Sequence, residues 1–384
     1  MFVCDIFRLP YRKHNSYSGL YRRKASAMKM TLRYFGPTDP IPLSHIRQIA
    51  GVKGVISTLY DTTPGEVWTR EAIRSLKSSI EDAGLELSGI ESVNVHDAIK
   101  IGCPGRRDMY IENYIKSLEA LGEEGVPLVC YNFMPVFDWT RSDLAKVRED
   151  GATVLSYEQA KIDAVDPEKL FESINENSNG LVLPGWEPER MEQIKQLFQM
   201  YQGVDNEKLF DNLVYFLKAI MPVCNKYDIK MAIHQDDPSW SVFGLPRIIT
   251  CGDNLVRMLE AVDDPHNGVT LCTGSLSSNP NNDVCEIIPR LKGRIYFAHV
   301  RNIRQYGNGN FDEAAHLSSD GSLDMFKIMK TLYDNGFDGV IRPDHGRAVW
   351  GEGGMPGSGL YDRAMGASYL NGIWESLEKI YPRK

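Results

Sequence analysis

Short runs of apolar and β-branched residues alternate with amphipathic helical segments from Met30 almost to the C-terminus. Eight such runs occur, and several are nearly continuously apolar, as in parallel strands buried on both faces. They lie at 32–35, 54–60, 87–92, 128–133, 230–234, 268–272, 294–299 and 339–342. Helical periodicity falls between them at 70–83, 109–124, 209–227, 254–262, 283–291 and 322–335. The pattern predicts a closed α/β barrel, the (β/α)8 TIM barrel, rather than a doubly wound open sheet, which would carry a glycine fingerprint after its first strand.

The N-terminal segment and the fourth connection set the predicted domain organisation. Residues 1–27 carry six basic residues and one acid and lack the apolar region of a secretory signal. We interpret them as a disordered or non-native leader, with an organelle transit peptide as the alternative. Residues 28–384 are predicted to form a single catalytic domain. The connection from about 138 to 206 is long, so we expect an insertion after the fourth strand, with helical pieces, at the C-terminal face of the barrel.

Composition excludes some classes of function. The formal net charge of −8 argues against binding the phosphate backbone of a nucleic acid. No stretch approaches the roughly 20 apolar residues of a membrane span, so no membrane association is expected. The seven cysteines are widely spaced and contain no CxxC pair, which is unlike a secreted disulfide framework. We therefore expect a cytoplasmic protein whose cysteines are mostly reduced thiols.

A residue whose side chain can bind a metal ion lies at or just after the end of each of the last four strand runs. In chain order these are His234, Cys272, His299 and Asp344. Barrel enzymes carry catalytic groups at the carboxyl ends of their strands, and neighbouring strands lie about 5 Å apart, so the four side chains can converge on one point. Two imidazoles, a thiolate and a carboxylate suit a divalent transition ion. Softness favours Zn²⁺, whereas Mn²⁺ or Fe²⁺ would keep positions open for substrate oxygens, so these residues leave the metal open.

Polar residues near the predicted ligands are candidates for contact with a substrate. His345 follows Asp344 directly, and an imidazole beside a metal can act as a general base or can orient a ligand. Arg141, Arg301 and Arg347 carry fork-shaped donors that suit a carboxylate, although each could instead form a structural ion pair. The segment 346–359 holds six glycines in fourteen residues and is interpreted as a mobile lid or a flexible surface loop.

At these motifs the chain resembles the mannonate dehydratase family, in the xylose-isomerase-like group of metal-dependent barrels. The resemblance rests on CYNFMPVFDWTR (130–141), LPGW (183–186), MAIHQDDP (231–238), FGLPRI (243–248), CTGS (272–275), HVRN (299–302) and RPDHGR (342–347). These stretches lie between residues 130 and 347. The resemblance implies dehydration of D-mannonate to 2-keto-3-deoxy-D-gluconate, a step of hexuronate catabolism, with Mn²⁺ (or Fe²⁺) as cofactor. By analogy with similar barrels, it also implies a homodimer.

The resemblance also implies roles for individual residues. Carried over by motif, the metal ligands are the same four residues, and His345 is a catalytic acid or base. Removal of a proton next to a carboxylate is difficult because that carbon acid is weak, and a metal bound to substrate oxygens stabilises the charge that develops. The substrate contacts expected from the matching stretches are Asn132, Arg141, Arg301, Asn302 and Arg347.

The glycine-rich segment departs from the family pattern. Family members carry a tyrosine after Pro-Gly there, with a phenol that takes part in proton transfer, whereas this chain has Ser358. A serine hydroxyl is shorter and much less acidic, so another group would have to supply the proton. The candidates are Tyr361, which is nearby but matches a different position of the motif, and a metal-bound water; we take Tyr361 as the candidate catalytic residue. Gln235 likewise replaces the usual proline. Two alternative functions stay open: a sugar or sugar-acid isomerase or epimerase on the same barrel, and a weakened homologue that binds a sugar acid without turnover.

Overall fold

The computed structural model describes residues 28–164, 194–291 and 293–383. The leader predicted at 1–27 lies outside these residues. So does the part of the predicted insertion between 165 and 193, which includes the LPGW stretch at 183–186.

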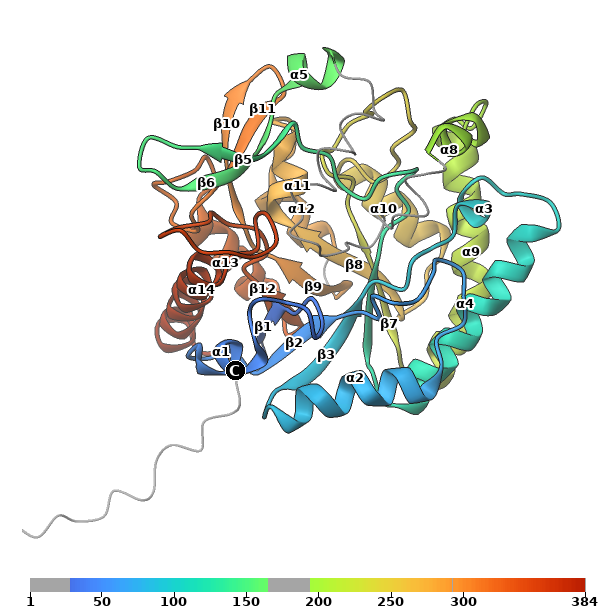
Figure 1. Ribbon diagram of the computed structural model, residues 1–384, viewed down its shortest axis with the longest axis horizontal. Coiled ribbons are helices and arrows are strands. Elements are labelled where there is room, and N and C mark those ends of the chain that lie inside the picture. The colour runs from blue at the N-terminus through green and yellow to red at the C-terminus, as the bar shows by residue number, and fades with distance from the viewer. Residues whose placement is uncertain (1–27, 165–193, 292, 384) are drawn as a thin grey trace, which may run out of the picture.

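Eight parallel strands close into a barrel at the centre of the molecule (Figure 1). Their order around the barrel is β1-β12-β9-β8-β7-β4-β3-β2, so each strand pairs with the next one of the alternating repeat. Every run predicted from the sequence overlaps one of these strands, and the (β/α)8 barrel is confirmed. The strands are β1 (Lys29–Arg33), β2 (Gly54–Ser57), β3 (Glu86–Glu91), β4 (Leu128–Tyr131), β7 (Lys230–His234), β8 (Asn267–Cys272), β9 (Ile295–His299) and β12 (Val340–Arg342).

Burial on both faces explains why the strand runs are so apolar. Every residue of β2 and β8 is buried. One buried cluster combines side chains of β2, β4, β7 and β9: Ile56, Leu128, Cys130, Ala232 and Phe297. Because β2 and β9 are not neighbours around the sheet, these side chains meet inside the barrel and fill it, as the layers of a TIM barrel do.

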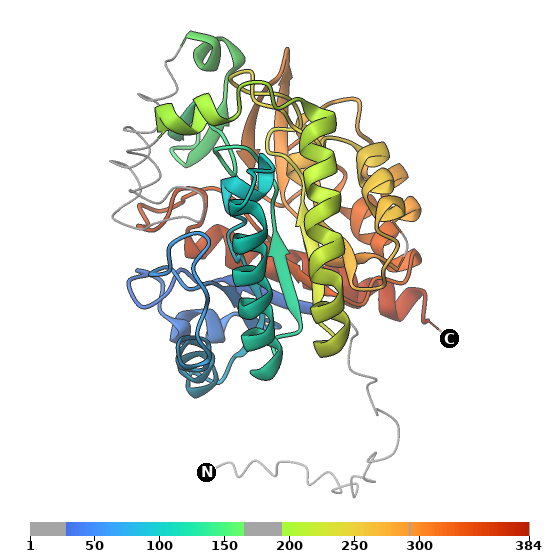
Figure 2. The ribbon, with the colours of Figure 1, turned by 90° about the vertical axis from the view of Figure 1, so that its right-hand side faces the viewer.

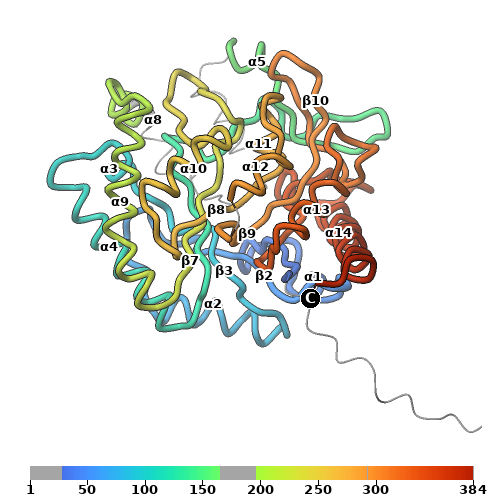
Figure 3. Tube along the Cα trace, turned by 180° about the vertical axis from the view of Figure 1, so that it is seen from behind, coloured from blue at the N-terminus to red at the C-terminus, as the bar shows by residue number. Residues whose placement is uncertain are grey.

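Helices surround the barrel on the outside (Figures 1 and 3). The helices described are α1 (Leu43–Gln48), α2 (Arg70–Asp82), α3 (Asp97–Lys100), α4 (Arg106–Glu123), α5 (Gln159–Ala164), α8 (Ile194–Met200), α9 (Asn206–Tyr227), α10 (Gly252–Ala261), α11 (Thr273–Ser278), α12 (Val284–Arg290), α13 (Met325–Asp334) and α14 (Leu360–Ile380). Among the described residues, no helix combines the length and the apolar character that a membrane crossing requires.

Helix α9 shows how the sequence builds this outer layer. Its apolar residues Leu209, Leu213, Phe216, Leu217 and Ile220 recur every three or four positions and are fully buried. Figure 2 shows α9 beside α4, and the rings of Phe216 and Tyr114 meet edge to face with centroids 5.0 Å apart. The helix begins at Asn206, three residues before the predicted start. The side chain of Asp205 caps it there by accepting a hydrogen bond from the Lys208 amide.

A second sheet was not predicted from the sequence. It is antiparallel, has the order β10-β11-β6-β5, and lies apart from the barrel strands in Figure 1. Its strands are β5 (Asp143–Val147), β6 (Thr153–Tyr157), β10 (Asn302–Gly307) and β11 (Asn310–Ala314). Strands β5 and β6 belong to the predicted insertion, where we expected helical pieces, and they pair with a hairpin that follows β9. Thr153 also pairs with Ala348, so the sheet adjoins the loop after β12 at the carboxyl end of the barrel.

Candidate metal centre and active site

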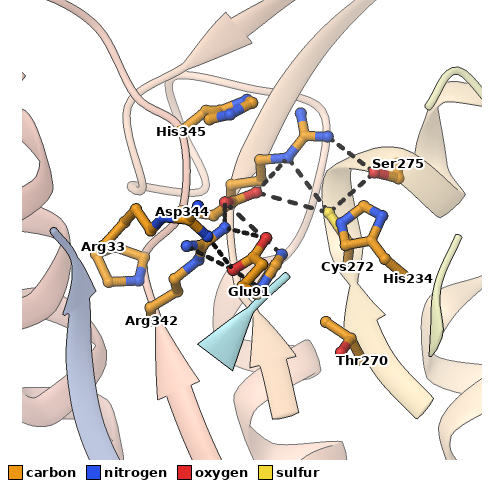
Figure 4. Close-up of polar contacts among 12 residues, drawn as sticks. Arg33, Glu91, His234, Thr270, Cys272, Ser275, Arg342, Asp344 and His345 are labelled. Atoms are coloured by element: carbon orange, nitrogen blue, oxygen red, sulfur yellow. Dashed lines mark hydrogen bonds and ion pairs between the residues drawn. The ribbon is translucent and has the colours of Figure 1, made fainter. Parts of the chain in front are cut away.

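The carboxyl ends of four adjacent barrel strands bring the predicted metal ligands together, and Figure 4 shows three of them, His234, Cys272 and Asp344. His234, Cys272 and His299 are the last residues of β7, β8 and β9, and Asp344 follows β12 by two residues. Parallel pairing sets Cys272 directly beside His299, so their side chains lie at the same level of the barrel. Asp344 has a positive φ of 62°, a conformation that costs energy for a residue with a side chain and that turns the chain beyond the strand end.

The donor atoms of these residues are close enough to share one ion. Donor atoms of His234, Cys272 and His299 all lie within 4.8 Å of one another. The Asp344 carboxylate lies 3.7 Å from the Cys272 Sγ and 3.7 Å from the His299 Nδ1. Both ring nitrogens of His299 are buried without a hydrogen-bond partner, although a buried polar atom normally has one. Two imidazoles, a thiolate and a carboxylate around such unpartnered nitrogens fit a divalent transition ion.

Neighbouring groups hold the predicted metal ligands in their orientations. The Nδ1 of His234 lies 2.6 Å from the carbonyl oxygen of Gln235, which directs the other ring nitrogen toward the cluster. The Gln235 side chain is fully buried and bridges β8: it donates to the Thr270 carbonyl at 2.7 Å and accepts from the Cys272 amide at 2.8 Å. A proline at position 235 could make neither contact, so this departure from the family pattern supplies a support for Cys272.

The charges around the site favour a thiolate and a carboxylate. Burial opposes ionisation of Cys272, but the Arg301 guanidinium and the neighbouring imidazoles of His234 and His299 outweigh it and hold the pKa of the thiol well below its usual range. Burial also opposes ionisation of Asp344, but the neighbouring His299, Arg342 and Arg301 outweigh it and lower the pKa of its carboxyl well below normal. Both groups are therefore in the charged form that binds a metal.

Glu91 is a second acid at this level that the sequence reasoning missed. It is the last residue of β3, so the strand-end rule that selected the other ligands would also have found it. With Cys130 and His299 it forms another group whose donor atoms lie within 4.8 Å of one another. Its carboxylate is already neutralised by Arg342 at 2.8 Å and Arg33 at 3.2 Å. Burial opposes its ionisation, but these cations and His299 lower the pKa of Glu91 far below normal, which makes it an arginine partner rather than a free ligand.

Two predicted substrate contacts, Arg141 and Arg301, form a buried ionic network instead. Neither side chain has any exposed area. Arg141 binds both carboxylate oxygens of Asp237, at 2.9 and 3.0 Å, and Arg301 donates to the same residue at 2.7 Å. Glu313 accepts from both arginines, at 2.8 and 2.5 Å. Arg301 approaches so closely that a Cβ at Gly274 would lie 2.6 Å from its Cζ, which explains the glycine in the CTGS stretch.

Removing one member of this network should destabilise the fold. Arg141→Met leaves Asp237 and Glu313 buried with one guanidinium between them, so the free energy of unfolding is expected to fall by about 3–5 kcal/mol. Urea denaturation followed by circular dichroism measures the change. Arg290→Met is the matched control because its ion pair with Asp253 is half exposed and should contribute no more than about 1 kcal/mol. Equal losses in the two variants would contradict this description of the network.

A cavity opens beside the four converging side chains. His345 and Asn132, both predicted at the site, line it together with His234, Asp344 and Ser358. The His345 Nδ1 is buried 3.5 Å from a Glu313 carboxylate oxygen, and its ring meets Trp139 edge to face with centroids 6.0 Å apart. His345 is therefore held by two neighbours while it borders the cavity.

The remaining predicted contacts lie outside the lining of this cavity. None of Arg141, Arg301, Asn302, Arg347 and Tyr361 is among the described residues that line the cavity. The Asn302 side chain instead donates to the Leu317 carbonyl at 2.9 Å and accepts from the Leu323 amide at 3.1 Å. Asn302 begins β10, which follows β9 closely in the chain.

Arg347 and Tyr361 make contacts outside the cavity. Arg347 pairs with Asp362 and Asp150, each at 3.0 Å. Tyr361 is 45 % exposed, and its ring lies 5.4 Å from that of Trp350. Ser358, which we expected to be the weaker proton donor, is the residue of this segment that reaches the cavity.

The fold and the strand-end cluster together define a metal-dependent (β/α)8-barrel enzyme. The profile of the D-mannonate dehydratase (UxuA) family matches residues 28–384. The chain belongs to that family, whose members are carbon–oxygen lyases of the hydro-lyase type.

Individual relatives agree with this membership. A mannonate dehydratase of Brachyspira hyodysenteriae is 65 % identical over 354 residues, which cover 92 % of this chain and 99 % of the relative. One of Thermotoga neapolitana is 53 % identical over 359 residues, which cover 93 % and 99 %. The crystal structure of mannonate dehydratase from Streptococcus suis serotype 2 superposes with a TM-score of 0.84 at 43 % identity and covers 93 % of this chain and 97 % of that one. A D-tagatose 3-epimerase-like protein, 14 % identical with a TM-score of 0.55, shares the fold.

Proposed function

We propose that this protein converts D-mannonate to 2-keto-3-deoxy-D-gluconate and uses Mn²⁺ or Fe²⁺ held by His234, Cys272, His299 and Asp344. The observation that carries the proposal is the convergence of these four side chains beside a cavity, in a chain of the D-mannonate dehydratase family. Of the four side chains, His234 and Asp344 line the cavity, which is where a sugar acid would bind.

The proposed reaction is a balanced elimination. The C2–H and C3–O bonds of D-mannonate break, a C2=C3 enol forms, the C3 hydroxyl leaves as water, and the enol becomes the 2-keto product. A divalent ion in this site would supply a positive charge that stabilises the negative charge developing on the substrate carboxylate as the C2 proton leaves.

His345 is the proposed acid or base of this elimination. Its Nδ1 is buried near Glu313, so the Nε2 is the nitrogen with access to the cavity. Burial opposes ionisation of Glu313, but Arg301, His345 and Arg141 outweigh it and lower its pKa to about 2, so the carboxyl group is ionised. The carboxylate therefore lies beside the ring and favours one orientation of it, as a general acid or base requires.

Product analysis tests the proposed function. Protein reconstituted with Mn²⁺ and incubated with D-mannonate should form a keto-deoxy acid, detected by mass spectrometry as the loss of one water. Metal-free protein is the control and should form none. Formation of an isomeric sugar acid that keeps every hydroxyl would instead establish an isomerase or epimerase. Metal-dependent binding without any product would establish the weakened homologue.

Ser358→Tyr is expected to raise kcat for D-mannonate by about tenfold. Ser358 lines the cavity beside His345, so a phenol at this position would add a proton donor more acidic than the serine hydroxyl. Initial rates at saturating substrate measure the effect, and Ser358→Phe, which adds the ring without the hydroxyl, is the control. A rate that stays unchanged in the tyrosine variant would show that a missing phenol does not limit turnover.

We further propose a cytoplasmic homodimer. The described cysteines are all free thiols, which suits a reducing compartment. The dimer rests on analogy with similar barrels. Light scattering coupled to size-exclusion chromatography tests it by measuring the mass in solution.

A further inference from the structure

Arg363 is a buried guanidinium that borders the cavity. It lies in the first turn of α14, is 2 % exposed and lines the cavity together with Ser358 and Asp344. Its Nε donates to the Gly359 carbonyl at 2.8 Å and its Nη1 to the Arg33 carbonyl at 3.2 Å. Its Nη2 is buried and has no hydrogen-bond partner. The group is thus fixed on two sides, and the N–H donors of its Nη2 are unused.

The charge of Arg363 has no carboxylate partner among the described residues. The three acids that act on it electrostatically are Asp39, Glu352 and Asp344. Asp39 accepts from the amides of Phe35 and Ile41, and Glu352 accepts from the amides of Val349 and Tyr361. Asp344 is paired with Arg342 and Arg301. Each of these carboxylates is therefore engaged elsewhere.

The other arginines of the cavity differ from Arg363 in this respect. Arg33 and Arg342 share the carboxylate of Glu91, and Arg342 also pairs with Asp344 at 2.6 Å. Burial, together with the nearby Arg342, lowers the pKa of Arg363 to about 10, and Asp39 offsets this only partly. A buried charge is expensive unless it is paired, so a guanidinium kept in this position requires an anion that comes from outside the chain.

We propose that Arg363 binds the carboxylate of the sugar-acid substrate through its Nη2 and thereby selects acids over neutral polyols. The inference rests on the proposed function for the identity of the acid. Arginine is the residue that best recognises a carboxylate, and the contacts to Gly359 and Arg33 fix its plane before the ligand arrives. It also assigns a function to α14, which the motifs of the sequence did not include.

The test compares a charged ligand with its uncharged counterpart. D-Mannonate and D-mannitol differ in having a carboxylate or a hydroxymethyl group at one end. In Mn²⁺-loaded protein, Arg363→Met is expected to raise KM for D-mannonate by about 10- to 100-fold and to change kcat less, because a hydrogen bond to a charged group is lost. The inhibition constant of D-mannitol should change by less than about threefold. Arg363→Lys keeps the charge without the fork and should give an intermediate KM.

The outcomes separate this inference from the proposed function. Arg290→Met, an exposed arginine variant, is the control and should leave both constants unchanged. An unchanged KM in Arg363→Met and Arg363→Lys, or an equal loss for D-mannitol, would overturn the inference while leaving the dehydratase activity standing. If the wild-type protein forms no product, the proposed function fails. The same ligand pair is then compared by the rise in thermal unfolding temperature. Selective loss of the D-mannonate effect in Arg363→Met would still support an anion site, and equal shifts for the two ligands would overturn it.

Discussion

His234→Ala should remove the bound metal and the activity together. The imidazole is one of three donors within 4.8 Å of one another, and its Nδ1 is already directed to the Gln235 carbonyl, so no other nitrogen can replace it. Loss of a direct ligand is expected to weaken metal binding by at least about 100-fold, since even the loss of a group that only orients a ligand costs 10- to 100-fold. Elemental analysis after dialysis measures metal per chain, and kcat is measured on the same sample. Asp344→Ala should give the same paired loss.

His45→Ala is the matched control for this experiment. His45 is an exposed imidazole on α1, outside the cluster, so its removal should change neither the metal content nor the rate. Full metal occupancy in His234→Ala would refute the assignment of the site. Loss of activity with the metal retained would move His234 from metal ligand to some other role.

His345→Gln is expected to keep the metal and to lower kcat by about 100- to 10,000-fold. Its Nδ1 lies beside Glu313 and its ring borders the cavity, so glutamine can fill part of the space but cannot take up and return a proton. Metal content and kcat are again measured on one sample, and KM should change little if His345 acts mainly in the transition state. Loss of the metal in this variant would instead make His345 a residue that supports the ligands.

The barrel and its metal cluster follow from short-range patterns in the sequence. Strands buried on both faces produce continuous apolar runs, and eight of them can only alternate with helices as a closed barrel or a large open sheet. Strand ends then fix the level of the side chains that follow, so His234, Cys272 and His299 could be placed together without any tertiary information.

The antiparallel sheet could not be predicted in the same way. Strand β6 pairs with β11, which lies more than 150 residues further along the chain, and its residues Phe311 and Asp312 match Tyr157 and Ser156. Such a pairing depends on the barrel having already brought two distant loops to one end. The local sequence pattern of the segment 138–206 does not indicate the pairing of β6 with β11, so we expected helical pieces there.

The partners of the arginines could not be predicted from the sequence for a related reason. A guanidinium suits a substrate carboxylate and a protein carboxylate equally well, and the sequence does not show which one it meets. Arg141 and Arg301 meet Asp237 and Glu313, whereas Arg363, in a helix without a motif, has an unused donor at the cavity. Pairing is a tertiary property, and only the structure distinguishes these cases.

The location of the metal is the most direct test of this account. Crystals of the protein grown with Mn²⁺ and measured at the manganese absorption edge should show one strong anomalous peak per chain. We predict it within about 2.5 Å of donor atoms of His234, Cys272, His299 and Asp344. A peak between Glu91 and Cys130, or no peak in a sample shown to contain Mn²⁺ and to turn over D-mannonate, would contradict the proposed centre.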